Sequence, residues 1–85
     1  MTRARGQSSR TQRNREFPFQ VTVLAESVRG KVLDRAIAFH KENGLLLEKH
    51  STLKNDTWYD AYCFAQRQSA ESFRALFGGE LRLVT

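Results

Sequence analysis

The stretch that decides the fold is residues 54–65, which read KNDTWYDAYCFA. Its first three residues have the composition of a hairpin turn, because Asn and Asp adopt left-handed backbone more readily than most residues. The segment after the turn, Thr57 to Ala65, is rich in aromatic residues and reads as a strand. The segment before it, roughly Leu45 to Leu53, predicts the other strand of the hairpin.

The residues upstream of this hairpin predict a strand followed by a helix. From Phe17 onward the side chains alternate in the manner of a half-buried strand. One side of that strand carries Phe17, Phe19, Val21 and Val23, and the other carries Gln20, Thr22 and Leu24. Ser27 can cap the helix, and Asn43-Gly44 supplies a left-handed stop. The apolar stripe of the helix is Val28, Val32, Leu33, Ala36, Ile37 and His40.

The residues downstream of the hairpin predict a second helix and a last strand. Ser69 can cap this helix, Gly78-Gly79 ends it, and Leu81 to Val84 form the strand. Its apolar stripe is Ala70, Phe73, Leu76 and Phe77. The resulting order of strand, helix, strand, strand, helix, strand predicts an α+β, ferredoxin-like fold. In that fold a four-stranded antiparallel sheet carries both helices on one face.

Length and composition limit what such a chain can be. It has 85 residues, 14 Lys+Arg against 9 Asp+Glu, a net charge of +5 and one cysteine. A chain of this length supports one hydrophobic core. No apolar run approaches the ~20 residues of a membrane helix, so we expect a soluble protein, with no membrane partner, in the cytoplasm. A single Cys63 allows neither an internal disulfide nor a zinc site with several thiolates.

Positive charge is concentrated in residues 1–16, which hold five arginines against Glu16. These are Arg3, Arg5, Arg10, Arg13 and Arg15. Because the segment is almost without apolar residues, we expect a disordered arm, followed by a ferredoxin-like domain over residues 17–85. The arm could bind phosphates or an acidic partner, could be a solvated extension, or could be a targeting peptide, although it lacks the apolar helical face of mitochondrial presequences.

Side-chain parity in the third strand predicts which residues lie on the open face of the sheet. The small, uncharged alternation of Tyr59, Ala61, Cys63 and Ala65 suits packing under the helices. The other alternation contains Asp60, which should avoid a dry core. With Asn55-Asp56 as a two-residue turn, the open face carries Trp58, Tyr62, Phe64, Lys49, Leu47 and Leu53. A three-residue turn would move the second strand's residues to the other face.

An exposed aromatic patch beside a lysine requires a partner. We expect a small non-catalytic binding module that acts through the open sheet face. The favoured partner is protein, either a second copy stacked face to face or a protein that this chain inhibits or adapts. The alternative is single-stranded RNA or another nucleic acid, with bases stacked on the aromatic residues and phosphates held by the arginine arm.

The layout from Phe19 to Val84 resembles an RNA-recognition motif. The resemblance rests on the strand order, the aromatic third strand and the following helix with Ala70-Glu71-Ser72-Phe73. It implies RNA binding on the sheet face. The chain departs from that family at Thr22, where the family has an aromatic residue. It also departs at residues 55–62, NDTWYDAY, where the family's octamer opens with Lys or Arg and Gly.

The sequence favours no catalytic site, metal site or cofactor. His40 lies on an apolar helix stripe, His50 faces away from Asp60, and Cys63 is expected among small apolar residues, where a thiol is inert. No His/Cys/Asp cluster has metal-ligand spacing, and no glycine motif suits a phosphate. Two less favoured hypotheses are a dimeric ferredoxin-like oxygenase and a regulatory ligand-binding domain, with Ser27 to Lys31 as the anion-facing segment.

Overall fold

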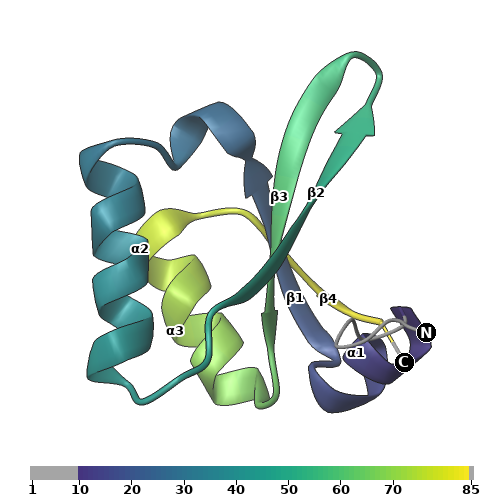
Figure 1. Ribbon diagram of the computed structural model, residues 1–85, viewed down its shortest axis with the longest axis vertical. Coiled ribbons are helices and arrows are strands. Elements are labelled where there is room, and N and C mark those ends of the chain that lie inside the picture. Colours follow the sequence, from purple (N-terminus) through teal and green to yellow (C-terminus); the bar gives the residue numbers. More distant parts are fainter. Residues whose placement is uncertain (1–9, 85) are drawn as a thin grey trace, which may run out of the picture.

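The computed structural model describes residues 10–84 and confirms the ferredoxin-like fold, with one additional helix at the start (Figure 1). The elements in chain order are α1 (Arg10–Glu16), β1 (Phe19–Leu24), the 3₁₀ turn η1 (Ala25–Ser27), α2 (Lys31–Glu42), β2 (Glu48–Lys54), β3 (Thr57–Phe64), α3 (Arg67–Phe77) and β4 (Glu80–Leu83). The four strands form one antiparallel sheet in the order β2-β3-β1-β4. Helices α2 and α3 lie together on one face of it (Figure 1).

The hairpin between β2 and β3 has the predicted two-residue turn. Asn55 and Asp56 have positive φ angles of 52° and 63°, which suit a type I′ turn and match the twist of the flanking strands. The ladder pairs Leu53 with Trp58 and Lys49 with Tyr62, so the predicted register is confirmed.

The hydrophobic core lies between the sheet and the two helices, and its centre is aromatic. Phe73 of α3 packs with ring centroids 4.7 Å from Tyr62 and 5.3 Å from Phe64 of β3. Val21 of β1, the ladder partner of Tyr62, is fully buried on the same side. The core residues with the lowest exposure are Val21, Val23, Val28, Ala36, Tyr62, Phe64, Ala70 and Phe73.

The predicted faces of β3 are therefore wrong. Tyr62 and Phe64 are 0% and 2% exposed beneath the helices, whereas Ala61 and Cys63 lie on the opposite face. Large rings are needed to fill the space between sheet and helices, and the charge of Asp60 is tolerated there because it has partners. Ser51 Oγ donates to Asp60 Oδ1 at 2.8 Å, and Lys49 Nζ lies 3.6 Å from Asp60 Oδ2.

Helix α2 begins later than predicted and α3 begins earlier. Ser27 ends the 3₁₀ turn instead of capping α2, and its Oγ donates to the carbonyl of Leu24 at 2.7 Å. Gly30 then adopts a φ of 57°, which glycine reaches without steric cost, and α2 starts at Lys31. Helix α3 starts at Arg67, so Ser69, which was predicted to cap it, lies inside the helix, and the helix ends at Gly78-Gly79 as predicted.

Helix α1 corrects the prediction of disorder for residues 10–16. Asn14 Oδ1 accepts a hydrogen bond from Gln20 Nε2 at 3.4 Å, which ties this helix to β1 on the face opposite α2 and α3. Residues 1–9 lie outside the described residues, and so do the side chains of residues 10–12. Within residues 10–84, no helix has the length and apolar character needed to cross a membrane.

Candidate functional site

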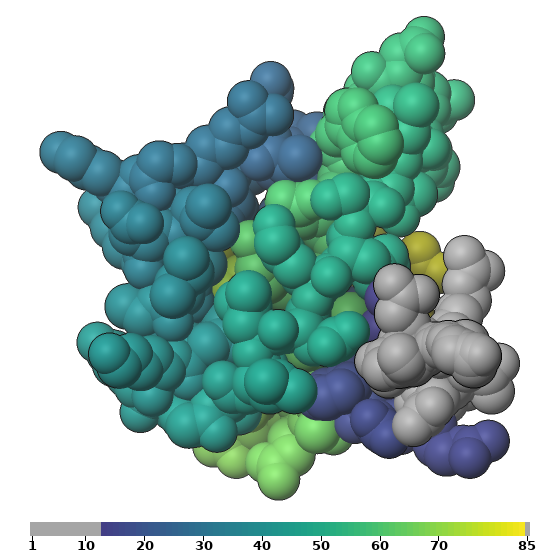
Figure 2. All heavy atoms as spheres, in the orientation of Figure 1, coloured from purple at the N-terminus to yellow at the C-terminus, as the bar shows by residue number. Residues whose placement is uncertain are grey.

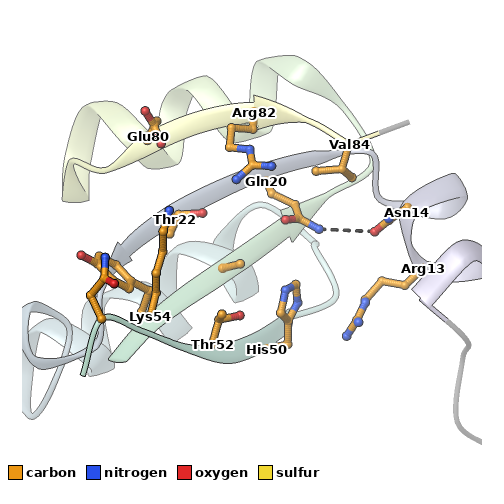
Figure 3. A pocket seen from close by; sticks show the side chains of 13 residues that line it. Arg13, Asn14, Gln20, Thr22, His50, Thr52, Lys54, Glu80, Arg82 and Val84 are labelled. Carbon is orange, nitrogen blue, oxygen red and sulfur yellow. Dashed lines mark hydrogen bonds between the residues drawn. The ribbon is translucent and has the colours of Figure 1, made fainter. Parts of the chain in front are cut away.

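The face of the sheet opposite α2 and α3 carries an open hollow of about 710 Å³. Helix α1 stands at one end of it, and the sheet forms its floor (Figure 3). The ladder partners Gln20 and Arg82, Thr22 and Glu80, and Thr52 and Tyr59 lie across adjacent strands in this floor. The lining is Arg13, Asn14, Gln20, Thr22, His50, Thr52, Lys54, Asn55, Tyr59, Ala61, Glu80, Arg82 and Val84.

Cationic groups enter this hollow from three elements. Arg13 comes from α1, Lys54 from the end of β2 and Arg82 from β4, and Glu80 is the acidic side chain in the lining. The three cations belong to segments far apart in sequence, which the sheet order brings around one floor (Figure 3). Three cations against one carboxylate leave the hollow with an excess of positive charge, which favours an anionic partner.

The floor between these charges is polar, with one large aromatic residue. Thr22, Thr52 and Gln20 present hydroxyl and amide groups that can donate and accept hydrogen bonds. Tyr59 is half-buried near the start of β3 and contributes the ring. A flat aromatic side chain among hydrogen-bonding groups suits a partner that has both planar and polar parts.

Cys63 and His50 meet at the edge of the hollow, but they do not form a nucleophile. The Sγ of Cys63 lies 3.8 Å from Nδ1 of His50 and 3.7 Å from the carbonyl oxygen of Ala61. Burial raises the pKa of the Cys63 thiol to about 11, with Arg13 lowering it and Glu48 raising it by smaller amounts. The sulfur is therefore a neutral thiol at neutral pH, and thiolate chemistry is not available.

Within residues 10–84, no three His, Cys, Asp or Glu side chains are grouped closely enough to hold a metal ion. His40 is a core residue on α2, stacked against Phe64 at 5.3 Å, and its Nδ1 lies 2.8 Å from the carbonyl of Ala36. It points from α2 into the core, on the side of the sheet opposite the hollow.

The binding surface predicted from sequence is divided by the structure. Tyr62 and Phe64 belong to the core and cannot meet a partner in the folded chain. Trp58 and Leu53 are ladder partners with the same strand parity as Tyr62, so they belong to the helix side of the sheet, and each is 53% exposed. The hairpin that carries them extends beyond the helices (Figure 1). Leu47 is 37% exposed just before β2.

Lys49 is engaged within its own chain. Its Nζ lies 3.6 Å from Asp60 Oδ2 and 5.7 Å from the centre of the Tyr62 ring. Of the arm residues, Arg13 lines the hollow and Arg15 lies in α1. Arg3 and Arg5 lie outside the described residues, and Arg10 is described by its backbone alone.

The floor residues Gln20, Thr22 and Tyr59 were not predicted as a site, although the sequence contained a signal for them. In β1 the valines Val21 and Val23 are unambiguously core residues, so their neighbours must face the other way. Pairing β1 with β3 then assigns Tyr59, the partner of Leu24, to the same open face. This assignment requires the register between two strands distant in sequence.

Comparison of the chain with known protein families, curated proteins and solved structures gave no match. The class defined by the fold and the site is a small α+β domain with a ferredoxin-like sheet and a cationic open face.

Proposed function

We propose that this protein is a small non-catalytic binding module whose open sheet face binds single-stranded nucleic acid. The observation that carries the proposal is the hollow itself, in which Arg13, Lys54 and Arg82 surround a polar floor that contains Tyr59. Proteins that bind single strands without enzymatic chemistry combine a positively charged groove with aromatic side chains on which bases stack.

Charge and shape both support a polyanion as the partner. Phosphates could pair with the cations at the rim, while an unstacked base could lie on Tyr59 and hydrogen-bond to Thr22 or Gln20. The arginines of residues 1–9 precede α1 in sequence and would add further positive charge to the same partner.

A face-to-face dimer of this sheet is less well supported. The aromatic residues Tyr62 and Phe64, which were expected to form its contact, are in the core. Stacking two open faces would bring together two surfaces that each carry an excess of positive charge, and like charges in a contact weaken association.

Binding of a fluorescently labelled single-stranded RNA, followed by anisotropy over a series of salt concentrations, tests the proposal. Replacing Tyr59 with Ala removes the stacking ring and should weaken binding by about 1–3 kcal/mol. Trp58→Ala is the matched control, because Trp58 directly precedes Tyr59 in β3 and is 53% exposed on the helix side of the sheet. The control should bind as tightly as the wild type.

The contribution of the cations at the rim is tested by the salt dependence of the binding constant. Arg82→Ala and Lys54→Ala should each lower the slope of log K against log salt by about 0.7, the value for one phosphate contact on a single strand. Arg35→Ala removes an exposed arginine from α2 and should leave the slope unchanged. No binding at low salt, or equal loss of affinity in Tyr59→Ala and Trp58→Ala, would refute the proposal.

A further inference from the structure

Strand β2 is an edge strand whose outer side is accessible. The sheet order gives it a neighbour on one side, β3. Residues Ser51 to Lys54 are exposed, and the hairpin tip stands clear of the helices in the space-filling view (Figure 2). The strand contains no proline, and its ladder with β3 runs without a bulge from Glu48 to Lys54. Such an edge can pair with another strand.

The turn geometry determines which backbone groups point outward from β2. In a two-residue hairpin the residues flanking the turn, here Lys54 and Thr57, exchange hydrogen bonds. Pairs along an antiparallel ladder then alternate between bonded and non-bonded. The residues whose N–H and C=O groups point away from β3 are therefore Lys49, Ser51 and Leu53.

One antiparallel register between two copies of β2 satisfies all of these outward groups. When Ser51 lies opposite Ser51 of the second copy, Lys49 lies opposite the second copy's Leu53, and the reverse pair follows by two-fold symmetry. Shifting this register by one hydrogen-bonded pair in either direction leaves one of these outward residues in each copy with no residue of the other β2 strand opposite its N–H and C=O groups.

The same register is complementary in charge. It places Glu48 of one copy opposite Lys54 of the second, and symmetry makes this pair twice, both times on the open face. In the shifted registers Glu48 would face Thr52, or Lys54 would face His50. Lys49 adds no repulsion, because its charge lies beside Asp60 of its own chain.

We propose that two copies of this chain associate through antiparallel pairing of their β2 strands, centred on Ser51. The dimer has one continuous sheet made of two four-stranded sheets, and it aligns the two open-face hollows side by side. This association does not depend on what the open face binds, because it uses the edge of the sheet.

Sedimentation velocity of the full chain, with charge variants of β2, tests this association. The wild type should form dimers. Glu48→Lys and Lys54→Glu each replace two attractive contacts by two repulsive ones, so each should raise the dimer dissociation constant at least about tenfold. Mixing the two variants should restore dimerisation, because each mixed pair again brings opposite charges together. Glu42→Lys, an exposed residue of α2, is the control for added positive charge.

A second variant tests the backbone pairing. Leu53→Pro removes an outward N–H, so it breaks no bond to β3 but blocks the ladder to the second copy. It should be a folded monomer, as judged by circular dichroism. A monomeric wild type, a dimer that persists in Leu53→Pro, or single charge variants whose mixture stays monomeric would each overturn the proposal.

Discussion

Replacing Tyr62 with Phe should stabilise this protein. The ring of Tyr62 is fully buried 4.7 Å from Phe73, but its hydroxyl has no hydrogen-bond partner among the described residues. Burial raises the pKa of the phenol, and the charge of Asp60 raises it further, so the hydroxyl is neutral and buried at neutral pH. Removing that hydroxyl keeps the ring and eliminates the cost of a buried polar group without a partner.

The expected magnitude follows from that cost. Leaving a buried donor or acceptor unpaired costs about 1–3 kcal/mol, so Tyr62→Phe should raise the free energy of unfolding by about 1 kcal/mol. For a domain of this size, that change should raise the melting temperature by about 4–8 °C, measured by circular dichroism and checked by urea unfolding. Tyr59→Phe on the open face is the control and should change stability by less than about 0.5 kcal/mol.

Two outcomes would contradict this reasoning. A loss of 1 kcal/mol or more in Tyr62→Phe would show that the hydroxyl is bonded in the folded protein. A folded Tyr62→Glu variant would show that position 62 is on the surface, as the sequence alone predicted, because a carboxylate in the aromatic core should prevent folding.

Three further predictions concern the core and the open face. Lys49→Met leaves the buried Asp60 carboxylate with only its hydrogen bond from Ser51 on β2, and should lower the free energy of unfolding by about 1–2 kcal/mol, measured by urea unfolding at pH 7. Gly79→Ala would place its Cβ 2.6 Å from the Thr22 carbonyl oxygen at a φ of 101°, and should lower the melting temperature by more than about 5 °C. The raised pKa of Cys63 makes the folded state hold its proton more tightly than the unfolded state, so stability is full below pH 9 and falls as the pH rises toward 11. Alkylation at pH 8 should accordingly be slow in the native protein and fast in denaturant; equal rates would contradict the burial of this thiol.

Several features of this fold could be derived from the sequence because they depend on neighbouring residues. The alternation that begins at Phe17, the turn at Asn55-Asp56 and the stop at Gly78-Gly79 each report local backbone preferences; the turn and the stop lie where they were predicted, and the first strand begins two residues later, at Phe19. The order of these elements then leads to the ferredoxin-like sheet. Exact helix starts were less well predicted, because η1 replaces the expected first turn of α2.

The candidate site depended on contacts between residues distant in sequence. Asp60 made one face of β3 look unsuitable for a core, although the predicted hairpin register already placed Lys49 and Ser51 on that face; the structure shows that these two side chains contact the carboxylate. The position of the aromatic residues follows from the same pairing, since Val21 and Tyr62 must share a face once β1 and β3 are in register.

The composition of residues 1–16 indicated the positive charge of this protein, but not where that charge acts. In the structure Arg13 of α1 lines the same hollow as Lys54 and Arg82, although these residues come from three different elements. Sequence periodicity by itself determined which segments form the four strands and helices α2 and α3, because that information is local, whereas helix α1 was not predicted. The face of the sheet that is buried, and the charges gathered on the other face, were decided by tertiary packing, because they require strand register and helix placement that no local pattern contains.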